Sequence, residues 1–424
     1  MDRIELEKVI SELEHKYNEL KEQKLKLNMT RGKPGSEQLD LSNELFEVIN
    51  KYGYKAEDGT DCRNYGIVEG LPEARRLFAQ ILEVEPDEVI VGGNSSLNLM
   101  HDIIVMAFNI GMVGSSKPWG KLAKIKFICP SPGYDRHFAI LESLGIEMIS
   151  VDMQKDGPDM DVVEKLVRND ASIKGIWCMP KYSNPDGITY SDEVVLRLAN
   201  MKTAAEDFRI FCDNAYVVHH LSDTPDKLKN ILTACKEAKN PDRVLIFSST
   251  SKITFPGAGI SAIAASRRNI DFIIKKISFQ TIGPDKINQL AHVYFLKDIK
   301  HIEDHMKKHA AIIKPKFDIV LNTMEKELGG KNIAWWNRPN GGYFISLYTL
   351  DGCAKEIVKM AGEAGVTLTG AGATYPYGKD PRDRNIRISP TFPSSDDLLK
   401  AINLLCICIQ LVSYRKKLST QAAF

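Results

Sequence analysis

Most of the common signatures of ligand binding are missing from this sequence. It has no P-loop, no G-x-G-x-x-G, no G-x-S-x-G nucleophile elbow and no spacing of His, Cys, Asp and Glu that is typical of a metal site. Lys and Arg number 56 against 55 Asp and Glu, so the formal net charge is only +1. A field this weak does not attract nucleic acid or an anionic membrane. We therefore expect no metal and no nucleic-acid partner.

Long apolar runs are also scarce. The longest, near 404–412, is interrupted by Gln410 and is shorter than the roughly 20 residues of a membrane span, so we expect it to be the buried face of a C-terminal helix. The opening MDRIELEKVISELEHKY has acidic residues where a signal peptide has its apolar region. The eight cysteines are scattered, several of them in apolar runs, as expected of reduced and buried thiols. We expect a cytoplasmic protein without a membrane partner.

The order of apolar patterns predicts an α/β protein. A length of 424 residues is too long for one core of ordinary size, so at least two packed units are expected. Residues 2–25 have apolar positions at helical spacing and predict an amphipathic helix. From about residue 75 to residue 265, helical segments alternate with strand-like runs, which is typical of a largely parallel sheet. These runs are 89–93, 126–129, 146–151, 173–179, 208–212, 244–247 and 260–265.

The last third of the sequence has a different pattern. Helical periodicity dominates to about residue 328, followed by strand-like runs at 343–348 and 385–389 and a closing helix. This pattern predicts a smaller α+β lobe. We expect residues 1–50 to be an N-terminal helix and arm belonging to that small domain, 51–300 to be the large domain, and 301–424 to be the small C-terminal domain.

Lys252 occupies an unusual place in the sequence. It follows an apolar strand-like run, precedes a Pro/Gly turn and stands next to four hydroxyl residues at 248–251. A lone lysine is more often a solvated surface group. At the carboxyl end of a strand, where α/β sheets bind ligands, a desolvated lysine has a lowered pKa and can form a Schiff base. The neighbouring hydroxyls can hold a phosphate.

Two other strand ends carry polar residues. Asp213 ends the run at 208–212 and is followed by Tyr216, while Asn184-Pro185 follows the run at 173–179. Each has an ordinary interpretation, as a helix cap or as a turn. A carboxylate at such a position can instead pair with a pyridinium nitrogen and keep that ring protonated.

Together these motifs resemble a known family. Asn184-Pro-x-Gly187, Asp213-x-Ala-Tyr216 and Ser249-x-x-Lys252 follow one another at successive strand ends, in the manner of class I/II aminotransferases that depend on pyridoxal 5'-phosphate. The resemblance runs over nearly the whole chain. It is closest to a bacterial subgroup of aspartate aminotransferases, which are similar in GPDKINQL at 283–290 and SKITFPGAG at 251–259.

The resemblance implies fold type I, with a mostly parallel seven-stranded sheet in the large domain, and a homodimer with shared active sites. Lys252 would hold the cofactor as a Schiff base and move a proton, Asp213 would pair with the ring nitrogen, and Asn184 and Tyr216 would reach its phenolic oxygen. Tyr134 would stack on the ring, although it could equally belong to the core. The phosphate would be bound by the residues Gly93, Asn94, Ser95 and Ser249, and by Tyr65 from the partner subunit.

The resemblance also indicates how a substrate would bind. Arg387 matches the arginine that grips the α-carboxylate, and Gly32 would offer its amide to the same group. The expected substrates are aspartate and 2-oxoglutarate, whose second carboxylate needs another cation. Lys286, presented to the other subunit, and Arg31 are the candidates, unless both are solvated surface charges.

One departure and two rival functions stay open. Members of class I usually have an arginine about eight residues after the Schiff-base lysine, but Ala258, Gly259 and Ile260 occupy that region here. Other groups must then neutralise the phosphate. The same residues would support transamination of other amino acids or β-elimination. A ligand-sensing regulator with an aminotransferase-like domain is a more remote alternative, because the roughly 50 residues before the main domain lack a basic recognition helix.

Overall fold

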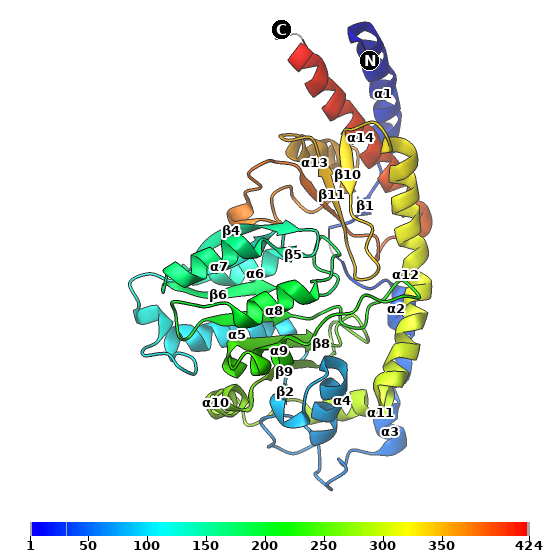
Figure 1. Ribbon diagram of the computed structural model, residues 1–424. Helices are drawn as coiled ribbons and strands as arrows, with labels where there is room; N and C mark the ends of the chain where they lie inside the picture. Colours follow the sequence, from blue (N-terminus) through cyan, green and yellow to red (C-terminus); the bar gives the residue numbers. More distant parts are fainter. Residues whose placement is uncertain (1, 31, 422–424) are drawn as a thin grey trace.

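The computed structural model describes residues 2–30 and 32–421 and is built around one large sheet (Figure 1). Its strand order is β2-β9-β8-β7-β6-β3-β4-β5. The bounds are β2 (Val89–Val91), β3 (Lys126–Ser131), β4 (Glu147–Gln154), β5 (Gly157–Pro158), β6 (Ile173–Cys178), β7 (Arg209–Asp213), β8 (Val244–Ser249) and β9 (Ser261–Ala265). Only β9 and β5 run against the other six strands.

All seven strands predicted for the large sheet are present, but the expected total of seven is wrong. The eighth is β5, which has two residues and pairs with the end of β4 across a tight turn. A segment that contains only Gly157 and Pro158 has neither β-branched residues nor an alternating pattern. Because its pairing depends on the turn and on β4, its own residues do not indicate a strand.

Alternation along the strands divides the large unit into two apolar layers. In β7, Ile210 and Cys212 face the core beneath α4 (Pro72–Leu82), α7 (Met160–Asn169), α8 (Asp192–Asn200) and α9 (Ile231–Glu237). Phe211 faces the opposite core, beneath α5 (Ser96–Asn109), α6 (Asp135–Ser143) and α10 (Arg267–Ile277). Successive side chains of a strand point to opposite faces, so both faces of the sheet are covered and its strands are buried.

A second core organises the smaller lobe. Its antiparallel sheet has the order β10 (Ala334–Trp336), β11 (Ile345–Thr349) and β13 (Asn385–Ile388). A short parallel pair, β1 (Leu27–Asn28) with β12 (Val366–Thr367), ties the N-terminal arm to it. Helices α1 (Arg3–Glu22), α13 (Ala354–Glu363) and α14 (Ser395–Gln421) share this core.

The first predicted helix is confirmed as α1. Asp2 and Glu5 form a capping box at its start, and Leu6, Ile10, Leu13 and Tyr17 are buried on one face. That face packs on α14, and Figure 1 shows the two helices side by side with both chain ends at the same extremity.

The apolar run near 404–412 is confirmed as the buried part of a helix. By length and composition α14 could cross a membrane, but 72% of its most apolar window is buried inside the protein. Leu404, Cys408 and Ile409 have essentially no exposed surface. Burial of this kind is typical of a core helix in a water-soluble fold, so the helix gives little support to a membrane span.

One long helix connects the lobes. After α11 (Lys286–Leu296), the 30-residue α12 (Ile299–Leu328) runs the length of the molecule (Figure 1) and contacts both α4 and α14. The N-terminal arm is shared as well: α1 packs in the small lobe, whereas α3 (Val48–Tyr52) packs on α11. We keep the division of the chain at about residues 50 and 300 as a proposal.

Candidate active site

The carboxyl ends of the parallel strands open into a cavity of about 570 Å³ between the two lobes. Loops after β3, β6, β7 and β8 supply its large-domain wall, and the N-terminal arm, β13 and the loop after β12 supply the other wall. Nine of the predicted site residues line it: Gly32, Ser95, Tyr134, Asn184, Asp213, Tyr216, Ser249, Lys252 and Arg387. Parallel strands present their carboxyl ends at one edge, which explains why motifs far apart in the sequence meet here.

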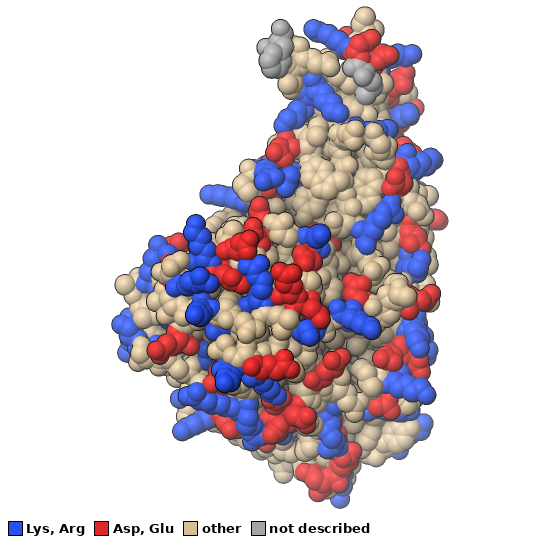
Figure 2. All heavy atoms as spheres, viewed as in Figure 1, with Lys and Arg blue, Asp and Glu red and all other residues tan. Residues whose placement is uncertain are grey.

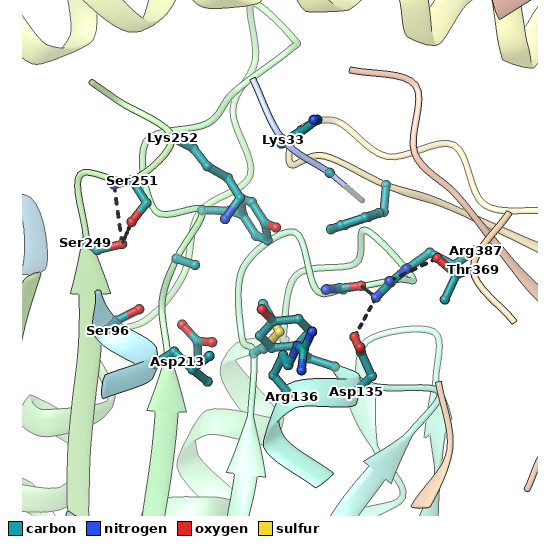
Figure 3. Close-up of a pocket in the computed structure, with 18 of the residues that line it drawn as sticks. Lys33, Ser96, Asp135, Arg136, Asp213, Ser249, Ser251, Lys252, Thr369 and Arg387 are labelled. Atoms are coloured by element: carbon teal, nitrogen blue, oxygen red, sulfur yellow. Dashed lines mark hydrogen bonds and ion pairs between the residues drawn. The ribbon is translucent and has the colours of Figure 1, made fainter. Parts of the chain in front are cut away.

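Lys252 points into this cavity from the turn after β8 (Figure 3). Its Nζ lies 5.1 Å from the centre of the Tyr216 ring and 5.8 Å from that of the Tyr343 ring. Desolvation lowers the pKa of Lys252, and the negative charge of Asp213 opposes this only partly. A larger neutral fraction of this amine is therefore available to attack a carbonyl carbon.

Asp213 is held by a partner that the sequence did not reveal. Its Oδ2 lies 2.9 Å from Nε2 of His137, on the first turns of α6, and the imidazole stacks on Trp177 with ring centres 4.2 Å apart. The other oxygen, Oδ1, is buried and has no hydrogen-bond partner among the described residues. A buried carboxylate oxygen without a partner is costly, so this atom marks a position where a donor from a ligand fits.

Two tyrosines and one amide surround the middle of the cavity. Burial raises the pKa of Tyr134 to about 12 and raises that of Tyr216 as well, so both phenols stay protonated and can donate hydrogen bonds. Asn184 lies on the loop after β6, and its Oδ1 accepts a hydrogen bond of 3.3 Å from Arg387. Its amide nitrogen remains as a donor toward the cavity.

Hydroxyl groups gather at one end of the cavity, where α5 begins. Ser95 is the N-cap of α5 but accepts no hydrogen bond from the helix, so its side chain is free for a ligand. Ser249 donates to Ser251 at 3.0 Å, and Ser251 and Ser96 also line the cavity (Figure 3). Hydroxyls beside a helix N-terminus suit a phosphate group. Ser251 is one of the four hydroxyl residues expected to hold a phosphate, whereas no expectation from the sequence included Ser96.

Gly93 and Asn94 lie behind this hydroxyl end and do not line the cavity. The Gly93 carbonyl accepts a hydrogen bond from Ser261 at 2.7 Å. The Asn94 side chain is directed to the carbonyls of Pro256 and Gly257, at 3.5 and 3.4 Å. In this arrangement both residues shape the turn before α5.

Arg387 lies at the opposite end, on β13, and is 5% exposed. Its Nη1 lies 3.1 Å from Asp135 Oδ1, and its Nη2 donates to Thr369 Oγ1 at 3.2 Å (Figure 3). Phe344 lies beneath the guanidinium, 4.9 Å from its central carbon. These contacts fix a planar cation that can bind a carboxylate by two parallel hydrogen bonds.

Gly32 is required by the packing at this end. A Cβ at this position would lie 2.5 Å from the ring of Phe344, which supports Arg387. Any larger residue must displace the ring, so glycine allows the arm to close over the arginine.

Two further predicted residues, Tyr65 and Lys286, do not line the cavity of this chain. Tyr65 is 82% exposed, and Arg31 lies outside the described residues. Lys286 is buried and donates to the carbonyl of Gly66 at 3.0 Å, so the alternative that it is a solvated surface charge is wrong. Because Gly66 follows Tyr65 directly, this hydrogen bond places Lys286 close to Tyr65.

The cavity contains two cations that the sequence analysis missed. Lys33, on the arm, has its Nζ 3.9 Å from the centre of the Phe392 ring. Arg136, in the first turn of α6, is exposed at the rim and makes no ion pair or side-chain hydrogen bond within residues 2–30 and 32–421. It borders the start of α5 as well as the central cavity. Both lie in segments that resemble the family, TRGKPG and PSPGYDRHF, but their place in the site depends on packing between distant segments.

Comparison with known proteins agrees with this geometry. A family model described as aspartate amino-transferase matches residues 1–421. An aspartate aminotransferase of Corynebacterium glutamicum is 44% identical over 402 residues, which cover 95% of this chain and 93% of that protein. The crystal structure of an aspartate transaminase from the same species superposes with a TM-score of 0.96 at 43% identity, covering 98% of each chain.

A more distant similarity involves a regulator. An HTH-type transcriptional regulator of Staphylococcus aureus is 25% identical over 279 residues, but the match covers only 65% of this chain and 59% of that protein. The extent and identity of the matches above are much greater.

Proposed function

This chain belongs to the aspartate aminotransferase family and is a transaminase of fold type I, and on that premise we propose that it moves the amino group of aspartate to 2-oxoglutarate with pyridoxal 5'-phosphate as cofactor. The observation that carries the cofactor assignment is the unpartnered Oδ1 of Asp213, which faces a cavity that also contains the amine of Lys252. When bound, this cofactor supplies an electron sink for the carbanion formed at the substrate Cα.

The residues present fit such a group from end to end. Lys252 Nζ would hold the aldehyde carbon, and Asp213 Oδ1 would accept a hydrogen bond from the protonated ring nitrogen. Asn184 and Tyr216 would donate to the phenolic oxygen, Tyr134 would stack on the ring, and Ser95 and Ser249 would bind the phosphate. Both the cavity volume of about 570 Å³ and the free hydroxyl of Ser95 support this placement.

The protein groups would then perform binding and proton transfer. Arg387 binds the α-carboxylate of the substrate and, with the arm at Gly32, orients the Cα–H bond toward Lys252. The neutral amine of Lys252 takes the proton from Cα. Since burial lowers the pKa of Lys252, a larger fraction of this amine is in the neutral form that can accept the proton.

The second carboxylate of a dicarboxylic substrate needs a further cation. Arg136 is the described residue best placed for this role, because it lines the same cavity and has no ion pair within the described chain. Lys286 from a partner subunit and Arg31 remain candidates. Arg136 also lies near the start of α5, where it could compensate for the missing arginine after Lys252.

We further propose a homodimer in which Tyr65 and Lys286 contribute to the partner's site. The backbones of Gly66 and Gly283 are in close contact, and this contact brings the segments of Tyr65 and Ile282 together. Ile282 is 61% exposed, so it forms an exposed apolar region near the ring of Tyr65. An exposed apolar patch of this kind is typical of a protein interface. A cytoplasmic location is supported by the eight cysteines, all of which are free and buried.

The proposal is tested by product analysis. The purified protein is incubated with 15N-aspartate and unlabelled 2-oxoglutarate. Formation of 15N-glutamate and of oxaloacetate is followed by mass spectrometry. Tyrosine, leucine and alanine serve as alternative donors. Release of free ammonium without a 2-oxo acid acceptor would indicate the β-lyase alternative, and a preference for aromatic or aliphatic donors would overturn aspartate specificity.

A further inference from the structure

A second cavity lies behind the strand ends that carry the active site. It has a volume of about 410 Å³ and is lined by Ile81, Leu82, Val195 and Ile231 together with Lys181 and Asn214; we call it the rear cavity. Asp213 points to the active site, so its neighbours Cys212 and Asn214 point to the opposite side of the sheet. This side is covered by α4, α8 and α9, of which α8 and α9 lie over the near face of the sheet in Figure 1.

Lys181 is the unusual residue of this cavity. Four lysines are buried among the described residues, and Lys181, with 9% of its surface exposed, is one of them. The other three have acceptors: Lys174 is paired with Asp207 at 2.6 Å, Lys286 donates to the Gly66 carbonyl at 3.0 Å, and Lys316 donates to the Thr391 carbonyl at 3.1 Å. In the described part of the chain, Lys181 makes no ion pair and no hydrogen bond through its amine.

Such a lysine is costly to retain. Buried lysines are almost always paired, and burial lowers the pKa of Lys181 because the charged form is poorly solvated. An anion in the rear cavity would remove this cost.

The neighbouring charges do not supply that anion. Glu83 and Asp226 also line the cavity, but neither approaches Lys181 within ion-pair distance. Both carboxylate oxygens of Asp226 already accept hydrogen bonds, from Thr189 at 2.8 Å and from Asn340 at 2.9 Å. Two further lysines, Lys227 and Lys229, also line the cavity.

Asn214 provides a second unsatisfied group. The residue is 7% exposed and lines the rear cavity, and within the described residues neither its Nδ2, which can only donate, nor its buried Oδ1, which can only accept, makes a hydrogen bond. Together with the Lys181 amine, the side-chain amide can donate to one carboxylate group. The rest of the lining combines aliphatic side chains, among them Ile81, Val195 and Ile231, with charged and polar ones.

We propose that the rear cavity is a binding site for a small organic carboxylate with an aliphatic body, whose carboxylate is held by Lys181 and Asn214. The volume lies within the roughly 300–1,000 Å³ of small-molecule sites. The two polar residues are placed within three positions of Asn184 and directly after Asp213. A ligand in the rear cavity therefore contacts the same strand ends that build the active site.

Hexanoate is a suitable probe, with hexan-1-ol as its neutral counterpart. Calorimetric titration of the holoenzyme should show binding of hexanoate that weakens at least about tenfold in Lys181→Met, the loss expected for one charge-assisted hydrogen bond. Because Met has a similar shape and removes an unpaired charge, this variant should fold. Lys229→Met is the matched control, since Lys229 also lines the cavity but pairs with Asp192 at 3.5 Å.

Carboxylates can also bind to Arg387, and Arg387→Leu separates the two sites. The proposal requires that this variant retain the event that Lys181→Met loses. It is overturned if Lys181→Met binds hexanoate as the wild type does, if only Arg387→Leu loses binding, or if hexan-1-ol binds equally well. None of these outcomes depends on transaminase activity.

A second measurement covers failure of Lys181→Met to fold. In the wild-type holoenzyme, acetylation of individual lysines by acetic anhydride is followed by mass spectrometry with and without hexanoate. Lys181 should be protected by hexanoate while Lys229 reacts at the same rate. An unchanged acetylation rate at Lys181 would refute the site.

Discussion

Replacement of Arg387 by leucine should reduce kcat/KM for every amino donor. The guanidinium is 5% exposed and is held by Asp135 at 3.1 Å and Thr369 at 3.2 Å, so a substrate carboxylate meets a preorganised, desolvated cation. Truncation of one partner of a buried charge pair costs about 2–5 kcal/mol. At about 1.36 kcal/mol per factor of ten, this corresponds to a loss of roughly 30-fold to 5,000-fold.

The environment of Asp135 indicates how the fold responds to the loss of Arg387. Its side chain is 33% exposed, so water can solvate this carboxylate after Arg387 is removed. The folded state should therefore survive, which circular dichroism and thermal unfolding would verify. Initial rates with aspartate, alanine and tyrosine then give kcat/KM for three donors that share the α-amino and α-carboxylate groups and differ in their side chains.

Arg384→Leu serves as the control for Arg387→Leu. Arg384 lies outside the cavity and stacks against Trp335 and Tyr348, so Arg384→Leu should keep near-normal kcat/KM. A loss in Arg387→Leu that is confined to aspartate would assign Arg387 to the distal carboxylate. A wild-type kcat/KM for all three donors would remove it from substrate binding.

Four further predictions address the remaining assignments. Lys252→Ala should abolish turnover and the borohydride-reducible link to the cofactor; a reduced link on another lysine would refute the assignment. Mixing Lys252→Ala chains with Tyr65→Ala chains should restore part of the activity, because one site of a mixed dimer would be intact; no recovery despite subunit exchange would place Tyr65 outside the partner's site. Arg136→Met should lower kcat/KM for aspartate about tenfold more than for alanine, and weakened cofactor retention instead would assign Arg136 to the phosphate. Burial raises the pKa of Asp186 from 3.8 to about 6, so protonation of this carboxyl stabilises the folded state by about 3 kcal/mol. This stabilisation is complete below about pH 4 and is lost as the pH rises through 6. The Tm of the wild type should therefore increase from pH 7 to pH 5 and that of Asp186→Asn should increase less, and an equal slope in both proteins would contradict this.

Much of the large domain could be predicted because its information is local. Each strand of the parallel sheet is a short apolar run between helical segments, and all seven predicted runs are strands. The site followed from the same regularity, since Asn184, Asp213 and Lys252 come after strands that end at one edge. The two-residue strands β1, β5 and β12 have no such local signal, because only their partners define them.

The parts of the site that escaped prediction depend on contacts between distant segments. His137 is an unremarkable histidine in a helical pattern until folding brings it within 2.9 Å of Asp213. Arg136 precedes it, and nothing in the sequence distinguishes a cation at a cavity rim from one on an open surface. Lys286 is the opposite example, a lysine that is buried rather than exposed. Its contact with Gly66 could not be predicted, because the segment around it is charged and rich in turn residues.

The comparison of Lys181 with Lys252 shows what a strand-end rule can and cannot decide. Both lysines stand three residues after a buried strand, β6 in one case and β8 in the other, and both precede a Pro/Gly turn. The strand and the turn are therefore common to both lysines, whereas the four hydroxyl residues at 248–251 precede Lys252 alone, and only Lys252 enters the cavity with Asp213 and Arg387. The two lysines differ in the side of the sheet on which their cavities lie. Which side each lysine reaches depends on how the chain packs after β6 and after β8. Burial lowers the pKa of both amines, and neither has an ion pair within the described residues, so a ligand can stabilise each of them: an electrophile at Lys252 and, as we propose, an anion at Lys181.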